Sequence, residues 1–77
     1  MEQKINQDAF IGKNIKDARV AAELSQEQLT AKLQTLGCDI SRGTLAKTEV
    51  GIRHIKASEI KVIKQILNIE YDDIFKG

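Results

Sequence analysis

Hydrophobic side chains recur along the chain at steps of three and four residues, the spacing that places them on one face of a helix. The first such stretch contains Phe10 or Ile11, then Ile15, Ala18 and Ala22. Charged residues fall between these positions, among them Lys13, Lys16 and Asp17. The pattern predicts an amphipathic helix whose N-terminal cap is Asn6 or Asp8.

A more strongly marked helix start follows at Ser25. Its hydroxyl can accept a hydrogen bond from the amide of Gln28, and the Gln28 side chain can reach back to the Ser25 amide. The apolar stripe continues through Leu29, Leu33 and Leu36. Gly37 can adopt the left-handed conformation that ends a helix, so the pattern predicts a helix over residues 26–36.

The same logic recurs one turn later, with Ser41 as the expected cap and Gly51 as the terminator of a helix over about 41–50. Residues in hydrophobic-staple positions flank both starts: Leu24 with Leu29, and Ile40 with Leu45. Only about four residues, 37–40, separate the two helices. This helix, turn, helix unit over about 25–51 has a known DNA-reading use, and it also occurs in unrelated helical bundles.

The remaining pattern predicts two further helical segments. Ile60, Ile63 and Leu67 share one face, Asn68 is a plausible C-terminal cap, and Lys56 is a poor N-terminal cap. The last segment, "EYDDIFKG", can form one closing turn that places its two apolar residues on the core. These residues are Ile74 and Phe75.

Composition agrees with an all-α fold, because proline is absent and Ile, Leu, Ala, Lys, Glu and Gln dominate. At 77 residues we expect one domain over 1–77, with its core within about 8–75. The single cysteine, Cys38, allows no internal disulfide, and no secretory signal is evident, so we expect a cytoplasmic protein with a free thiol. Apolar runs are far shorter than the roughly 20 residues that cross a bilayer.

Charge changes the picture because it is unevenly distributed. The formal net charge is only +1, yet residues 40–64 hold six basic and two acidic side chains. Residues 1–39 carry a net −1, and residues 65–77 a net −2. A local positive block is compatible with phosphate binding, although a solvated helical face gives the same count.

Three segments together resemble the Cro and phage-repressor type of helix-turn-helix protein, the XRE family. They read "LSQEQLTAKL", "ISRGTLAKTEVGIR" and "EIKVIKQILNIEYDDIF", and the match covers nearly all of residues 11–75. The resemblance implies a compact, five-helix, lambda-repressor-like domain. It places the helix over 41–50 in the major groove of DNA and the helix over 26–36 across the backbone.

The resemblance implies that four residues of the third helix face the bases: Arg42, Gly43, Ala46 and Lys47. Arg42 has the planar fork that bonds guanine O6 and N7, whereas a solvated cation in a first helical turn is slightly unfavourable. Lys47 can reach a guanine or a phosphate. Gly43 either lets the helix approach the bases closely or is a glycine tolerated near a helix end.

Candidate phosphate contacts flank this groove-facing edge: Gln26, Thr44, Arg53, His54 and Lys56. The family also pairs an arginine with a glutamate inside the domain, at the positions of Arg19 and Glu49. Such a pair would join the first helix to the third and fix the orientation of the reading helix. The side chains expected to point into the core here are Ile40, Leu45, Thr48 and Ile52.

The chain departs from the family pattern in three places. Between the second and third helices it reads "QTLGCDI", several residues more than the shortest turns, so we expect the second helix to gain about one turn. Thr48 replaces an aliphatic residue of the core face, and Lys56 replaces a capping hydroxyl. We expect each of these two to lower stability by about 1 kcal/mol.

The sequence thus predicts a repressor-like, sequence-specific regulator of bacterial or phage type that binds double-stranded operator DNA as a homodimer, without a cofactor. The fourth helix and the tail, including Tyr71 and Phe75, are candidates for the dimer surface. The alternative is a protein-interaction module, such as an antitoxin or an adaptor, that keeps the fold without DNA affinity. An enzyme is not expected, because no catalytic motif is present, and His54 lacks the neighbours of a metal ligand.

Overall fold

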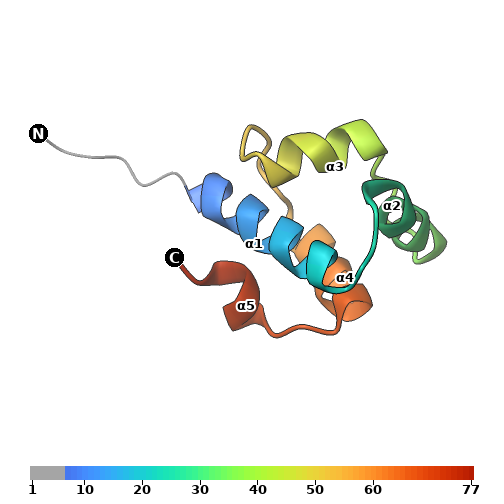
Figure 1. The fold of residues 1–77 in the computed structure, drawn as a ribbon. Coiled ribbons are helices and arrows are strands. Elements are labelled where there is room, and N and C mark those ends of the chain that lie inside the picture. Colours follow the sequence, from blue (N-terminus) through green and yellow to red (C-terminus); the bar gives the residue numbers. More distant parts are fainter. Residues whose placement is uncertain (1–6) are drawn as a thin grey trace, which may run out of the picture.

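The computed structural model describes residues 7–77, and all regular secondary structure in this part of the chain is helical. The helices are α1 (Gln7–Ala21), α2 (Gln26–Thr35), α3 (Arg42–Glu49), α4 (Ala57–Leu67) and α5 (Tyr71–Phe75). α1 runs through the middle of the molecule and packs against α3 on one side and against α4 and α5 on the other (Figure 1). The all-helical architecture predicted from the sequence is confirmed.

The helix starts at Ser25 and Ser41 are the ones predicted. The Ser25 hydroxyl accepts a hydrogen bond from the Gln28 amide at 3.0 Å, and the Ser25 amide donates to Gln28 Oε1 at 2.8 Å. Gly37 and Gly51 both have left-handed backbone, at φ 83° and 82°. α2 therefore ends within one residue of the predicted position, and the Gly that follows each helix turns the chain out of it.

The predicted cap at the end of α4 is confirmed, whereas the predicted caps at the start of α1 are not. Asn68 has φ 54° and ends α4 in the left-handed conformation, as predicted. Asn6 lies outside the described residues, and Asp8 belongs to the first turn of α1 and not to its cap.

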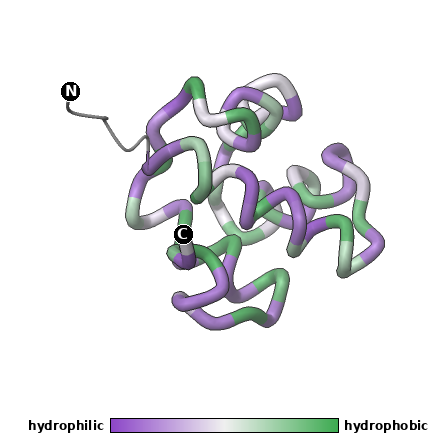
Figure 2. Tube along the Cα trace, turned by 60° about the vertical axis from the view of Figure 1, so that its left-hand side comes forward, coloured by the Kyte–Doolittle hydropathy of each residue, from purple (hydrophilic) through white to green (hydrophobic). Residues whose placement is uncertain are grey.

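The core is drawn from every helix. It consists of Ile11, Ile15, Leu29, Leu33, Ile40, Leu45, Ile55, Ile60, Ile63, Leu67 and Ile74. Along the trace, hydrophobic and hydrophilic stretches alternate at short intervals, as expected of helices that each bury one face (Figure 2).

Four residues expected in the core are exposed, and those predictions are wrong. They are Ala22, Leu36, Ile52 and Phe75. Each lies at or beyond the end of a helix, where the chain leaves the helical period on which the prediction rested. In the segment after α3, Ile55 occupies the core while Ile52 is 74% exposed.

Two glycines let α1 approach the C-terminal part of α3 closely. A Cβ atom at Gly12 would clash with the carbonyl oxygens of Thr48 and Glu49. A Cβ atom at Gly51 would lie 2.6 Å from the Cα of Ala9. The backbones of α1 and α3 therefore meet without side chains between them, which fixes α3 on the central helix.

A buried amide attaches the C-terminal segment to α1. Asn14 donates from Nδ2 to the carbonyl oxygens of Ile74 and Lys76, at 2.8 and 2.7 Å. Its own exposure is 8%, so both of its amide protons are satisfied inside the protein. Within residues 7–77 we find no helix with the length and apolar character of a membrane span.

Candidate nucleic-acid interface

The residues for which base contacts are predicted lie along α3, from its first residue to its last turn. They are Arg42, Gly43, Ala46 and Lys47. Positions three and four apart are neighbours on a helix surface, so these four share one side of α3. All are exposed except Ala46, which is half-buried. The structure thus brings the predicted base-reading residues together on an accessible edge.

The start of this edge is held by a local cap. The Ser41 hydroxyl accepts from the Thr44 amide at 3.2 Å and donates to Thr44 Oγ1 at 3.0 Å. Thr48, on the inner side of the helix, donates from its hydroxyl to the Thr44 carbonyl at 3.0 Å. Thr48 is buried as predicted, and its hydroxyl has a partner, which reduces the expected cost of a polar atom in the core.

The far end of α3 is anchored to α1 by a buried ion pair. Arg19 donates from Nε to Glu49 Oε2 at 2.7 Å and from its terminal nitrogen to Glu49 Oε1 at 3.1 Å. The other terminal nitrogen donates to the Leu24 carbonyl at 2.8 Å. Both charged residues are less than a tenth exposed, so the bidentate geometry operates away from bulk water.

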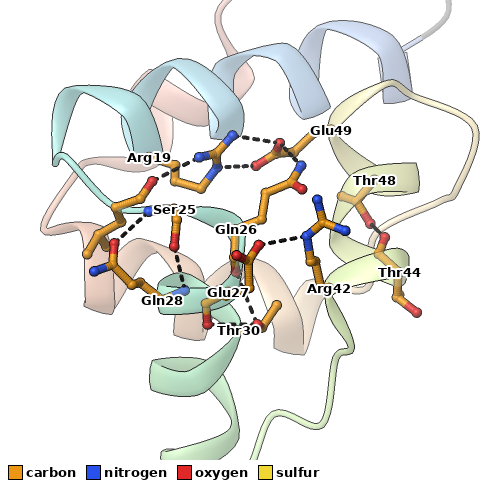
Figure 3. A network of polar contacts seen from close by, with 11 residues as sticks. Arg19, Ser25, Gln26, Glu27, Gln28, Thr30, Arg42, Thr44, Thr48 and Glu49 are labelled. Carbon is orange, nitrogen blue, oxygen red and sulfur yellow. Dashed lines mark hydrogen bonds and ion pairs between the residues drawn. The ribbon is translucent and has the colours of Figure 1, made fainter.

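Gln26 extends this anchor to α2. It donates from Nε2 to Glu49 Oε1 at 2.9 Å, so one carboxylate receives bonds from α1 and from α2 (Figure 3). Gln26 is the first residue of α2, where the backbone amides of a helix lack intrahelical acceptors. Three helices are thus connected through Glu49, which sets how α2 and α3 lie relative to each other.

A second link between α2 and α3 involves the predicted base-reading arginine. Arg42 donates from Nε to Glu27 Oε1 at 2.6 Å (Figure 3). Both side chains are about two-thirds exposed, at 65% and 67%. The sequence analysis missed Glu27, because the two residues are 15 positions apart and no helical or turn spacing relates them.

Arg53 lies inside the segment between α3 and α4 and makes internal contacts. It forms two hydrogen bonds with the Glu59 carboxylate, at 3.0 and 2.8 Å, and one with the Thr48 hydroxyl at 3.2 Å. The hydrogen bonds from Arg53 lower the pKa of Glu59 below its ordinary value near 4.5. The charge of Arg53 is therefore matched by a buried carboxylate inside the fold.

The other two candidates in this segment are exposed. The Nδ1 atom of His54 lies 3.1 Å from Asp8 Oδ1, at the start of α1. Lys56 precedes α4, and its amide donates to Glu59 Oε1 at 2.9 Å. Glu59 thus makes its half of a capping box by binding the Lys56 amide, and the Lys56 side chain extends into solvent.

Apolar side chains also border the exposed edge. Val50 and Ile52 follow α3 directly and are 64% and 74% exposed. They flank Gly51, which is buried against Ala9 of α1. The surface beyond the C-terminal end of α3 is therefore partly hydrophobic.

The positive block of the sequence divides between two parts of the structure. Arg42 and Lys47 lie on α3, and Arg42 is paired with Glu27, while Lys56 directly precedes α4. Lys61 and Lys64 lie on α4, where they border a hollow together with Tyr71 of α5, and the Lys64 ammonium lies 5.0 Å from the centre of the Tyr71 ring. The charge near α3 is thus smaller than the sequence block indicates.

Gly43 has open space around it. A Cβ atom there would have the Ser41 hydroxyl oxygen as its nearest neighbour, at 4.0 Å. The fold of the monomer therefore does not require a glycine at this position, unlike the positions of Gly12 and Gly51.

Cys38 lies half-buried between α2 and α3. Burial raises the pKa of its thiol, so the thiol is protonated at neutral pH. In the part of the chain that the structure describes, no group of three or more His, Cys, Asp or Glu residues is arranged to hold a metal ion.

Comparison of the chain with protein-family models, with curated proteins and with solved structures found no match in any of the three. The site therefore has to be interpreted from its own residues and geometry.

Proposed function

We propose that the protein is a sequence-specific DNA-binding regulator with a lambda-repressor-like fold, in which α2, the turn and α3 form a helix-turn-helix over about 25–51. In this proposal α3 enters the major groove and α2 lies across the backbone. The protein acts as a homodimer in the cytoplasm of a bacterium, encoded by the bacterium or by a phage.

The observation that supports this most is the combination of an exposed edge and a rigid anchor on one short helix. Arg42, Gly43 and Lys47 are exposed on α3, while the buried Glu49 carboxylate at the other end binds Arg19 and Gln26. A reading helix needs both properties, because its side chains must reach base edges and its axis must be held in one orientation.

On this basis each exposed residue of the edge has a role. The terminal nitrogens of Arg42 bond guanine O6 and N7, a contact worth roughly 1 to 3 kcal/mol of discrimination. Lys47, one turn later, reaches a second guanine or a phosphate. Gly43 and Ala46 present little side chain between them, which allows α3 to lie close to the bases.

Phosphate contacts come from the groups beside this edge. Gln26 and the amides of the first turn of α2 suit an anion, because unpaired amides and the helix dipole favour negative charge there. The hydroxyl of Thr44, the imidazole of His54 and the ammonium of Lys56 are the other donors. Arg53, whose guanidinium also binds Glu59, completes the set.

The test is selection of binding sites from random DNA duplexes at several salt concentrations. We expect one enriched sequence, with two related half-sites about 34 Å apart, as two copies of α3 in a dimer require. Affinity should fall steeply with salt, because Lys and Arg side chains that bind phosphates release counterions. No enrichment at low salt would contradict the proposal.

A matched pair of variants distinguishes the loss of a specific base contact from the loss of general charge attraction. Arg42→Ala and Lys16→Ala each remove one exposed positive charge, and Lys16 lies on the outer side of α1. We expect Arg42→Ala to weaken binding to the selected duplex and to relax the preference at one base pair of each half-site. Equal effects of the two variants would indicate charge attraction alone.

A second candidate function, a protein-interaction module, is favoured by Val50 and Ile52. Two adjacent apolar side chains more than half exposed are typical of a contact surface when they belong to a larger patch. In this alternative the α3 edge binds another protein, such as a toxin. It predicts that random duplexes are not enriched and that Arg42→Ala leaves DNA affinity unchanged.

A further inference from the structure

We propose that Glu27 determines specificity by holding Arg42 so that its two terminal nitrogens, and not Nε, read guanine. This inference rests on the proposed DNA-binding function. It makes Glu27, a residue of α2, responsible for the orientation in which Arg42 meets a base. It also gives Glu27 a second effect, which is to weaken binding to DNA of other sequences.

The geometry of the pair leaves the arginine ready to read a base. Nε is the nitrogen of Arg42 that donates to Glu27, at 2.6 Å. The terminal nitrogens of Arg42 lie on the side of the guanidinium away from Glu27 (Figure 3). An arginine bonds guanine in a bidentate manner with two parallel N–H groups, and the terminal pair provides them.

The backbone that carries this carboxylate is held in position. Glu27 belongs to the first turn of α2, beside the Ser25 and Gln28 capping box and next to Gln26, which bonds Glu49. The backbone of Glu27 is therefore held by the same network that orients α3. An exposed arginine otherwise samples many rotamers, and restricting it before binding reduces the entropy lost when it contacts a base.

The charge of Glu27 acts on binding to unselected DNA. An arginine without a partner binds any phosphate, which adds affinity but no sequence preference. The ion pair of Arg42 and Glu27 has no net charge, so it adds little general attraction to DNA. The carboxylate is also repelled by phosphates. Guanine O6 and N7 are neutral acceptors, so a contact with them is weakened less by the nearby carboxylate than a contact with an anionic phosphate.

The experiment compares three variants by fluorescence anisotropy, with the selected duplex and a scrambled duplex of the same composition. Glu27→Ala removes the carboxylate, and Glu27→Gln keeps an oxygen acceptor without the charge. Glu23→Gln is the matched control, because it removes the same charge from the exposed turn between α1 and α2. The quantity measured is the ratio of the two dissociation constants.

We expect Glu27→Ala to reduce this ratio on the order of tenfold, mainly through tighter binding of the scrambled duplex. Glu27→Gln should reduce it less, and its salt dependence on the scrambled duplex should steepen by about one unit of slope. Glu23→Gln should leave the ratio unchanged. In an Arg42→Ala background, Glu27→Ala should have no further effect on the ratio.

Three outcomes would overturn the inference. If the wild type prefers the selected duplex and Glu27→Ala keeps the same ratio, this inference fails and the proposed function stands. If the wild type shows no preference, both fail. An exposed ion pair contributes little to stability, so a large fall in the thermal midpoint of Glu27→Ala, with loss of all binding, would assign Glu27 a structural role instead.

Discussion

Gly43 and Gly12 both lie in helices, but their surroundings differ. Gly12 is buried where α1 crosses α3, and the carbonyl oxygens of Thr48 and Glu49 fill the space that a Cβ atom would need. Gly43 is exposed in the first turn of α3 with open space around it. A glycine that the fold does not need lowers helix stability, so Gly43 is either a contact position for a partner outside the monomer or a residue tolerated near a helix end.

These surroundings predict opposite effects of the same substitution. Gly43→Ala should raise the free energy of unfolding by up to about 0.5 kcal/mol, because alanine has the higher helix propensity and the position lies in the first turn of α3. Gly12→Ala should lower it by about 1 to 3 kcal/mol, because backbone atoms cannot move aside. Urea unfolding measures both. We further expect Gly43→Ala to bind the selected duplex more weakly despite its stability, and unchanged affinity would show that the glycine is merely tolerated.

We expect substitutions of Arg19 and Glu49 to be strongly coupled in their effects on the free energy of unfolding. Arg19→Met and Glu49→Gln should each destabilise the protein by about 3 kcal/mol, because each leaves a buried partner unmatched. The double variant should lose less than the two single losses combined. The exposed pair of Lys13 and Asp17, 2.8 Å apart, is the matched control, with expected losses below about 0.5 kcal/mol. Strictly additive losses for Arg19 and Glu49 would contradict the proposed anchor.

Among the elements, the sequence predicted the helix starts well, because the bonds of a cap join residues three apart. The Ser25 and Ser41 caps and the Asn68 terminator are of this local kind. The burial of residues just past the helix ends could not be predicted, since periodicity does not say in which direction the chain turns. Ile52 is the clearest case, because the loop buries Ile55 in its place.

The candidate site was predictable to a similar degree. The family resemblance placed the four candidate base-reading residues on one edge, and three of them are exposed in the structure. The partners of Arg42 and Arg53 were not predictable, because Glu27 and Glu59 reach them only through the way the helices pack. Gly12 was missed for the same reason.

The segment between α3 and α4 predicts a dependence of stability on pH. Arg53 holds the pKa of Glu59 below about 4.5, so the ionised carboxylate favours the folded state. This contribution is complete above that value and is lost as the pH falls through the lower pKa of the folded protein. Glu59→Gln should therefore be less stable than the wild type at neutral pH, and the difference should narrow in urea unfolding as the pH falls below about 4.5. A difference that stays constant with pH would contradict the pairing.

For the whole molecule, the distribution of charge and the size of the reading edge lead to the same expectation. The basic residues are divided between α3 and α4, so one copy of the protein offers few phosphate contacts. In the proposed complex, one α3 also reaches only a few base pairs. Two copies on a two-fold site double both contributions, which is why we propose a homodimer on DNA.

The central claim is that the exposed edge of α3 reads base pairs. The most direct measurement is the affinity of the wild type and of Arg42→Ala for the selected duplex and for duplexes that carry each single base-pair change. We predict that the wild type loses roughly 5-fold to 150-fold at one guanine in each half-site, and that Arg42→Ala no longer distinguishes that base pair while keeping its other preferences. The same dependence on every base pair in both proteins would contradict the account.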